Sequence, residues 1–134
     1  MTSFLIDSNT IADFLSRQEE TLQQINSALV AGDTLNLCRP VHYEVLRGLL
    51  WRDASAKYRQ FERSIGLFFS WVELTDEDWV QAARFYATTR SAGKQLADTD
   101  LLLAALSYRL NVSIISTDKD FDVLPINRTS WRKV

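Results

Sequence analysis

The chain has 134 residues, 46% hydrophobic and 24% charged, a balance typical of a single globular domain with a sizeable core. Its net charge of −2 and pI near 5.3 give no general sign of nucleic-acid binding, although a local basic patch can act within an acidic protein. The single cysteine, Cys38, and single histidine, His42, exclude an intrachain disulfide, a cysteine-based zinc site and a Ser-His-Asp triad built in the ordinary way.

Short apolar runs alternate along the chain with longer helical patterns. In the first half of the chain, the expected elements are strand 3–6, helices 9–17 and 20–31, strand 35–38, and helices from Pro40 to about Trp51 and over 54–67. The second half is expected to form a strand within 68–74, a helix from "TDEDW" to about Arg90, and a helix over 99–110 that ends at a left-handed Asn111. Strand 112–116 and a short last strand at 122–126 complete the prediction. This alternation predicts an α/β fold: a single domain over residues 1–134, with a central parallel sheet of four to five strands flanked by helices on both faces.

Two further expectations concern location. The first ten residues lack the basic and apolar regions of a signal peptide. No apolar run approaches the ~18 residues of a membrane span. A cytoplasmic protein without membrane contact is therefore expected.

Acidic residues follow the ends of the first two predicted strands. Asp7 comes directly after strand 3–6, and Glu44 lies in the first turns of the helix that follows strand 35–38. Ligand sites in parallel α/β sheets lie outside the carboxyl ends of the strands. Both carboxylates are therefore expected at that edge of the sheet.

Three more aspartates should reach the same edge from the C-terminal part of the chain. The helix over 99–110 runs back for roughly 18 Å at ~1.5 Å per residue. The strand over 112–116 then returns about 17 Å at ~3.3 Å per residue. Because the two lengths match, Asp98 and Asp100 at the start of the helix should face Asp118 at the end of the strand.

Such a cluster of carboxylates indicates a metal site. Neighbouring carboxylates each raise the cost of ionising the others, and a divalent cation relieves that cost. Oxygen ligands suit hard cations such as magnesium or manganese. Phosphodiester hydrolysis is the natural chemistry, because a metal activates water and neutralises the charge that builds on the phosphate.

Four motifs in this order resemble the PIN-domain ribonucleases, and in particular the VapC-type toxins of bacterial toxin–antitoxin pairs. "FLIDSN" (4–9) resembles the family's opening strand and first acid, and "HYEVLRGL" (42–49) resembles its Glu-Leu-x-x-Gly type of motif. "DTDLLLAALSYRLNVSIISTDKDF" (98–121) resembles the Asp-x-x-Ile-Ala-Ala helix and the strand ending in Thr-x-Asp/Asn. Ser116 stands where the family often has threonine, which keeps the hydroxyl.

The resemblance implies a magnesium- or manganese-dependent endoribonuclease. It is expected to form a homodimer, to be inhibited by a small VapB-like antitoxin, and to cut transfer RNA or a ribosomal RNA loop. The implied catalytic metal ligands are Asp7, Glu44, Asp100 and Asp118, with Asn9, Asp98, Ser116 and Asp120 in supporting positions. Because an acidic site does not attract RNA unaided, Arg47 and Lys94 are candidates for holding RNA phosphates.

Other interpretations stay open at this point. Asp7, Asp98, Asp100 and Asp118 can each serve as an ordinary cap or turn residue, and Glu44 as a solvated helix residue. "DSNT" (7–10) can be read as a degenerate loop of a haloacid-dehalogenase-like aspartyl phosphatase with Asp7 as the nucleophile, although Asn9 replaces the expected acid. A non-catalytic module that only binds a partner through an acidic rim is the third alternative.

Overall fold

Five parallel strands form the centre of the molecule in the computed structural model, which describes residues 1–132. The strands lie in the order β3-β2-β1-β4-β5, and every neighbouring pair is parallel. Their bounds are β1 Ser3–Ile6, β2 Thr34–Leu37, β3 Phe69–Trp71, β4 Ser113–Ile115 and β5 Arg128–Thr129. The predicted parallel sheet is thus confirmed, while the last two residues of the predicted 1–134 domain lie outside the described residues.

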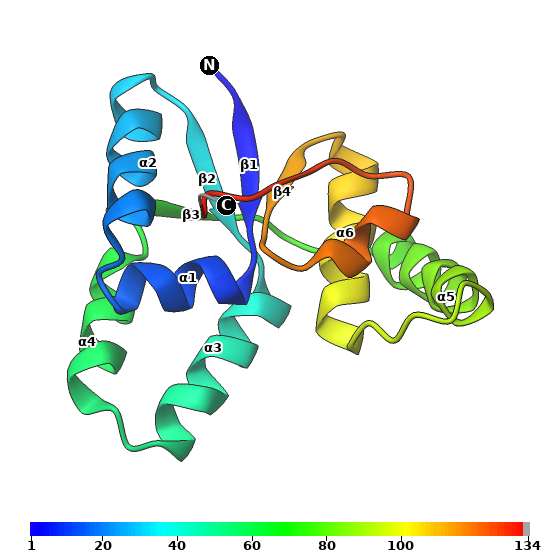
Figure 1. The fold of residues 1–134 in the computed structure, drawn as a ribbon, viewed down its shortest axis with the longest axis horizontal. Coiled ribbons are helices and arrows are strands. Elements are labelled where there is room, and N and C mark those ends of the chain that lie inside the picture. Colours follow the sequence, from blue (N-terminus) through cyan, green and yellow to red (C-terminus); the bar gives the residue numbers. More distant parts are fainter. Residues whose placement is uncertain (133–134) are drawn as a thin grey trace.

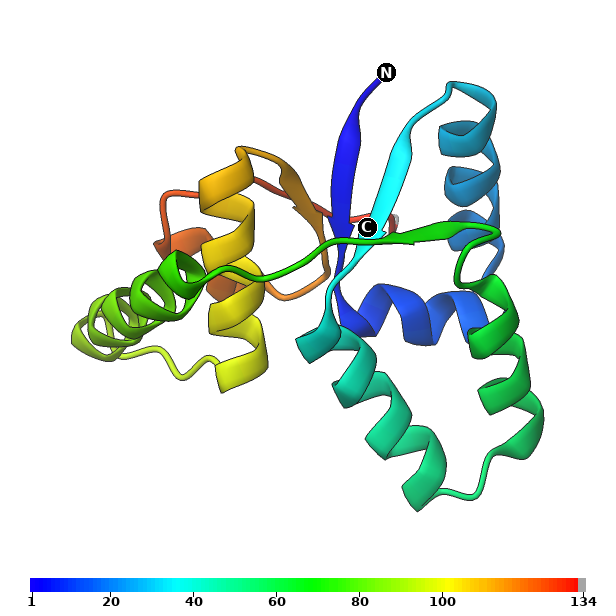
Figure 2. The same ribbon diagram turned by 180° about the vertical axis from the view of Figure 1, so that it is seen from behind.

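Helices cover the sheet from both sides. Their bounds are α1 Ser8–Leu15, α2 Glu19–Val30, α3 Arg39–Trp51, α4 Ser55–Ser64, α5 Asp76–Ser91 and α6 Asp98–Leu110. Figures 1 and 2 show α1, α2 and α4 on one side of β1 and β2 and α5 with α6 on the other, while α3 extends from the end of β2. None of these helices in the described residues has both the length and the apolar character needed to cross a membrane.

The core is densest where α6 meets the sheet. Leu5 pairs with Ile114 between β1 and β4, and both side chains are fully buried. Every residue of α6 from Leu101 to Ser107 is buried, because the helix packs against β4, α3 and α5 at once. A helix that is apolar all round belongs in such a position. This packing holds the first turn of α6 beside the carboxyl ends of the central strands.

Predicted helix ends are confirmed at two places. Asp78 accepts a 2.8 Å hydrogen bond from the backbone N–H of Thr75, which makes the first turn of α5 the capped start that "TDEDW" predicts. Asn111 ends α6 with a left-handed φ of 54°, a conformation that asparagine tolerates better than most residues.

The predicted last strand over 122–126 is wrong. A 3-10 helix, η1, occupies Lys119–Val123 in its place, and the side chain of Asp118 starts it by accepting a 2.9 Å hydrogen bond from the N–H of Asp120. The fifth strand is only the two residues of β5, further along the chain. Phe121 within this helix and Leu124 directly after it are both buried, so the segment reaches the core without forming a strand, a difference that an apolar run alone does not reveal.

Candidate metal centre

The beginnings of three helices meet at the carboxyl ends of β1 and β2. Helix α1 follows β1 through Asp7, α3 follows β2 through Cys38, and the first turn of α6 lies next to the start of α3 (Figure 1). This is the edge at which parallel α/β sheets place their ligand sites.

Asp7, Glu44 and Asp100 form one carboxylate cluster at this edge. Each contributes an oxygen, and the three oxygens lie within 4.8 Å of one another. Asp7 is 2% exposed, whereas Glu44 and Asp100 are partly open to solvent. The strand-end argument from the sequence predicts this convergence of residues from three distant segments.

Asp7 is held in place by three donors. Its Oδ1 accepts a 2.8 Å hydrogen bond from the backbone N–H of Ser8. Its Oδ2 accepts from Ser116 Oγ at 2.7 Å and from Asn9 Nδ2 at 3.2 Å. Burial raises the pKa of Asp7, the bonds from Ser116 and Ser8 oppose that rise, and the nearby charge of Glu44 adds to it.

Glu44 is oriented by two hydroxyl groups. Ser8 Oγ donates to its Oε1, and Thr99 Oγ1 donates to its Oε2 at 2.7 Å. The sequence alone predicts no role for Ser8 or Thr99. The only signal for them is their position inside the motifs, directly after Asp7 and directly before Asp100.

Asp100 is the most strongly perturbed carboxylate of the cluster. Burial, followed by the charges of Asp7 and Glu44, raises its pKa to about 7. Its Oδ2 also accepts a 3.2 Å hydrogen bond from the backbone N–H of Ala97 at the start of α6. Near neutral pH, Asp100 is therefore partly protonated in the metal-free cluster, and a bound cation would favour the loss of that proton.

Asp118 lies at the margin of the cluster. It is not one of the three carboxylates within 4.8 Å of each other, and its Oδ1 accepts from the N–H of Asp120. Its charge nevertheless raises the pKa values of Asp7 and Asp100. The structure thus brings three of the four predicted acids into close contact and the fourth within electrostatic reach.

The four predicted supporting residues divide into two pairs. Asn9 and Ser116 contact Asp7, and Asn9 also donates to Ser116 Oγ at 3.1 Å, which ties the ends of β1 and β4 together. Asp98 is exposed as the first residue of α6, where Ala97 takes the cap position. The carboxylate of Asp120 lies 3.6 Å from Lys94 Nζ.

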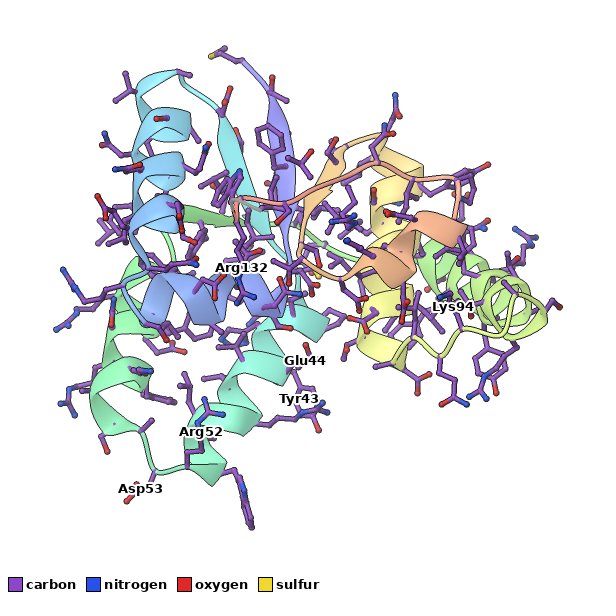
Figure 3. The ribbon with its side chains drawn as sticks, viewed as in Figure 1. Tyr43, Glu44, Arg52, Asp53, Lys94 and Arg132 are labelled. Carbon is purple, nitrogen blue, oxygen red and sulfur yellow. The ribbon has the colours of Figure 1, made fainter. Side chains whose placement is uncertain are left out.

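The two candidate RNA-binding cations are both near acids. Arg47 Nη2 lies 3.7 Å from Glu44 Oε2, and its guanidinium lies 5.2 Å from the centre of the Tyr43 ring. Figure 3 shows Tyr43 and Glu44 together on α3, and Lys94 on the side of the molecule formed by α5 and α6. Arg47 is therefore beside the cluster, whereas Lys94 is engaged with Asp120.

Cys38 and His42 lie outside the cluster's hydrogen bonds. Burial raises the pKa of the Cys38 thiol to about 11, so the thiol stays protonated and unreactive. The His42 ring packs against Phe61 and Trp71, with centroid distances of 5.5 and 5.0 Å. Both residues belong to the packing of the core, as the sequence indicates.

The donor set fits a hard divalent cation. All three clustered side chains are carboxylates, and each gains from a positive charge at the point where their oxygens converge. Asp7, Glu44 and Asp100 are the residues that would hold such a cation, directly or through water. The fold and this cluster define the class of the protein: a parallel α/β domain with an acidic strand-end site.

A family comparison narrows the class further. The model of the PIN domain family matches residues 4–127, and the chain therefore belongs to the PIN domain family. This assignment gives no support to the phosphatase alternative. A search of curated proteins finds no match.

Several solved structures have similar folds at low sequence identity. A chain of VapBC2 from Rickettsia felis, bound to a promoter DNA fragment, has a TM-score of 0.81 at 12% identity, covering 98% of this chain and 100% of that chain. A toxin–antitoxin complex from Klebsiella pneumoniae gives 0.69 at 16%, covering 97% and 98%. VapC20 from Mycobacterium tuberculosis, described as a sarcin–ricin loop cleaving toxin, gives 0.64 at 14%, covering 92% and 95%.

Proposed function

We propose that this PIN domain is a divalent-metal-dependent endoribonuclease and the toxin component of a VapBC-type toxin–antitoxin pair. The observation that carries the proposal is the carboxylate cluster, in which Asp7, Glu44 and Asp100 come from three elements and converge within 4.8 Å. These residues are the proposed catalytic metal ligands, together with Asp118 at the margin. Magnesium or manganese is the proposed cofactor.

Some side chains of the site would bind the cation, and others form hydrogen bonds to those ligands. A bound divalent cation would acidify water and offset the charge that develops on the scissile phosphate. Ser116, Asn9 and the N–H of Ser8 hold Asp7 in a fixed, buried position, and the bonds from Ser116 and Ser8 oppose the rise in its pKa. Such hydrogen-bonded partners of metal ligands commonly control affinity and orientation.

Glu44 and Asp100 complete the proposed arrangement. The hydroxyl groups of Ser8 and Thr99 hold both oxygens of Glu44, so this carboxylate presents a fixed face to the cluster. With a pKa of about 7, Asp100 is partly protonated at neutral pH, and a bound cation would favour its ionised form. Arg47, beside Glu44, is the proposed contact to the RNA phosphates, and the roles predicted for Lys94, Asp98 and Asp120 stay predictions.

The proposed partners are RNA, an antitoxin and a second copy of the chain. The Klebsiella complex supports an antitoxin partner, and the description of VapC20 as a sarcin–ricin loop cleaving toxin supports a loop as the target; a transfer RNA target stays a prediction. Exposed Trp79, Val80 and Tyr108 on α5 and α6 offer apolar surface that a homodimer would bury. Cytoplasmic action, where these RNAs are found, is part of the proposal.

Brief induced expression in a bacterial host tests the function. The expected result is growth arrest together with new RNA ends at one or a few defined positions, found by sequencing RNA fragments. Asp7→Asn, which removes the buried charge but keeps the shape, should abolish both effects while the protein accumulates normally. Equal toxicity of the Asp7→Asn strain, with no new RNA ends in either strain, would favour the non-catalytic partner-binding alternative.

A further inference from the structure

A groove leads away from the carboxylate cluster between α1 and α3. It has a volume of about 260 Å³, and Ser8, Asn9 and Glu44 line the end that opens on the cluster. Gly48, Arg52 and Lys57 line it further along. One continuous groove therefore joins a candidate catalytic acid to two cationic side chains.

Arg52 lies back over its own helix toward Glu44. Helical side chains lean toward the N-terminus, so a residue covers the preceding turn. A Cβ atom on Gly48 would meet Arg52 Nη1 at 3.4 Å, which places the guanidinium directly against the backbone of Gly48. Gly48 is one turn, or ~6 Å, from Glu44 along α3. Figure 3 shows Glu44 and Arg52 on this helix, with Asp53 in the loop beyond it.

The positive charges of Arg52 and Lys57 are not neutralised by the protein. Lys57 Nζ lies 3.5 Å from Ser16 Oγ, a neutral partner. Neither side chain forms an ion pair with a carboxylate among residues 1–132, whereas Arg109, Arg128 and Arg132 are each paired with an aspartate. Two unpaired cations in one groove favour a bound anion.

We propose that Arg52 and Lys57 form a phosphate-binding subsite for the RNA strand, holding a phosphate that neighbours the scissile one. The inference rests on the proposed nuclease function and adds the path of the substrate to it. In the proposed reaction the scissile phosphate lies at the carboxylate cluster, and the groove that opens there is also lined by Lys57 and by Arg52, whose guanidinium lies over Gly48. A single RNA strand running along α3 would thus place its scissile phosphate at the metal site and a neighbouring phosphate at Arg52 and Lys57. Positioning phosphates is a usual role of arginine and lysine.

The test compares the unmodified protein with the Arg52→Gln/Lys57→Met double variant on a single-stranded oligoribonucleotide that contains a mapped cut site. The double variant is expected to lose at least about tenfold in kcat/KM, the loss typical of a charge-assisted hydrogen bond. The dependence of log kcat/KM on log salt concentration should become shallower by about one for each cation removed. Arg59→Gln is the matched control, because Arg59 is exposed on the same helix as Lys57 but lines a different groove.

A second arm identifies the phosphate. Each phosphodiester within two nucleotides of the cut is replaced in turn by an uncharged methylphosphonate. One replacement should slow the unmodified protein and leave the double variant unaffected, because the same contact is already gone.

The outcomes separate the two proposals. If the unmodified protein cuts no RNA, the proposed function fails and the subsite fails with it. If the unmodified protein cuts RNA and the double variant is as active as Arg59→Gln, the subsite alone is overturned. Equal slowing of both proteins by every methylphosphonate would also overturn it, because the two cations would then act on something other than a neighbouring phosphate, such as a protein partner.

Discussion

Ser116 Oγ donates a 2.7 Å hydrogen bond to Asp7 Oδ2, which joins the ends of β4 and β1 across 109 residues of sequence. Both residues are almost completely buried, with Ser116 at 0% and Asp7 at 2% exposure. A buried carboxylate needs donors to remain ionised, because burial alone disfavours its charge. This bond is therefore central to the chemistry of the site.

Removing the Ser116 hydroxyl should weaken both folding and cleavage. Ser116→Ala is expected to lower the free energy of unfolding by about 1–3 kcal/mol, the usual cost of leaving a buried polar group without its partner. It should also raise the pKa of Asp7 further, so the acidic limb of the cleavage pH profile moves to higher pH. Ser116→Thr keeps the hydroxyl and should preserve that limb. An unchanged profile in Ser116→Ala would contradict this role.

The raised pKa of Asp100 predicts a specific pH dependence of stability in the metal-free protein. Between about pH 4 and pH 7 the folded state binds a proton on Asp100 that the unfolded state has lost, because the pKa of this aspartate is about 7 in the folded protein and 3.8 when it is unperturbed. The free energy of unfolding should therefore fall as the pH rises through this window. After solvent screening the fall is on the order of 1 kcal/mol.

Asp100→Asn should reduce this fall, since asparagine does not titrate and only the smaller contribution of Asp7, whose pKa is also raised, remains. Urea unfolding in the presence of a chelator, at pH 5 and pH 8, measures the effect. Asp98→Asn makes the same substitution at an exposed position two residues away and should behave like the unmodified protein. An Asp100→Asn protein that loses as much stability between the two pH values as the unmodified protein would refute the electrostatic account of the cluster.

Thr99 is predicted to act through Glu44. Thr99→Val removes the 2.7 Å donor to Glu44 Oε2 while keeping a similar shape. The metal concentration that gives half-maximal cleavage should rise by about 10-fold or more, a typical effect of losing a hydrogen bond to a metal ligand. Thr99→Ser keeps the donor and should retain the original metal dependence. Matching metal dependence in Thr99→Val and Thr99→Ser would show that the bond is not needed.

A buried ion pair between α5 and α6 is predicted to dominate the stability of that side of the molecule. Arg109 Nε lies 2.8 Å from Asp78 Oδ1, and the Asp78 side chain is 1% exposed. Arg109→Met should lower the free energy of unfolding by about 3–5 kcal/mol, because it leaves a buried carboxylate without its cation. Arg84→Met, on exposed α5 surface, should change it by less than about 0.5 kcal/mol. A similar small change in Arg109→Met would show that solvent reaches Asp78.

Spacing along the chain is enough to predict the order of the helices and strands and most of the acidic cluster. Strand ends in a parallel sheet lie at one edge, so Asp7 and Glu44 are placed by the strands that precede them. Matching the length of the helix to the length of the following strand places Asp100. The positions of Asp7, Glu44 and Asp100 therefore follow from their spacing along the chain.

Other features depend on contacts between distant segments and are not visible in the spacing. Ser8 and Thr99 bind Glu44 across 36 and 55 residues, and their roles follow from how α1, α3 and α6 pack. The incorrect strand at 122–126 has a similar cause, because the cap that Asp118 provides favours a 3-10 helix over an extended chain. The groove with Arg52 likewise requires the side chain to fold back over Gly48.

The most direct test of the metal-dependent site is the cleavage rate of one defined RNA as a function of magnesium and of manganese concentration. The purified protein and its Asp100→Asn variant are compared, with and without a chelator, after circular dichroism shows both to be folded. We expect the rate of the unmodified protein to saturate with metal and to vanish with chelator, and the variant to remain below about 1% of that rate at every concentration. Cleavage that survives the chelator, or an Asp100→Asn variant that cuts as fast as the unmodified protein, would contradict the assignment of Asp7, Glu44 and Asp100 as the catalytic metal centre.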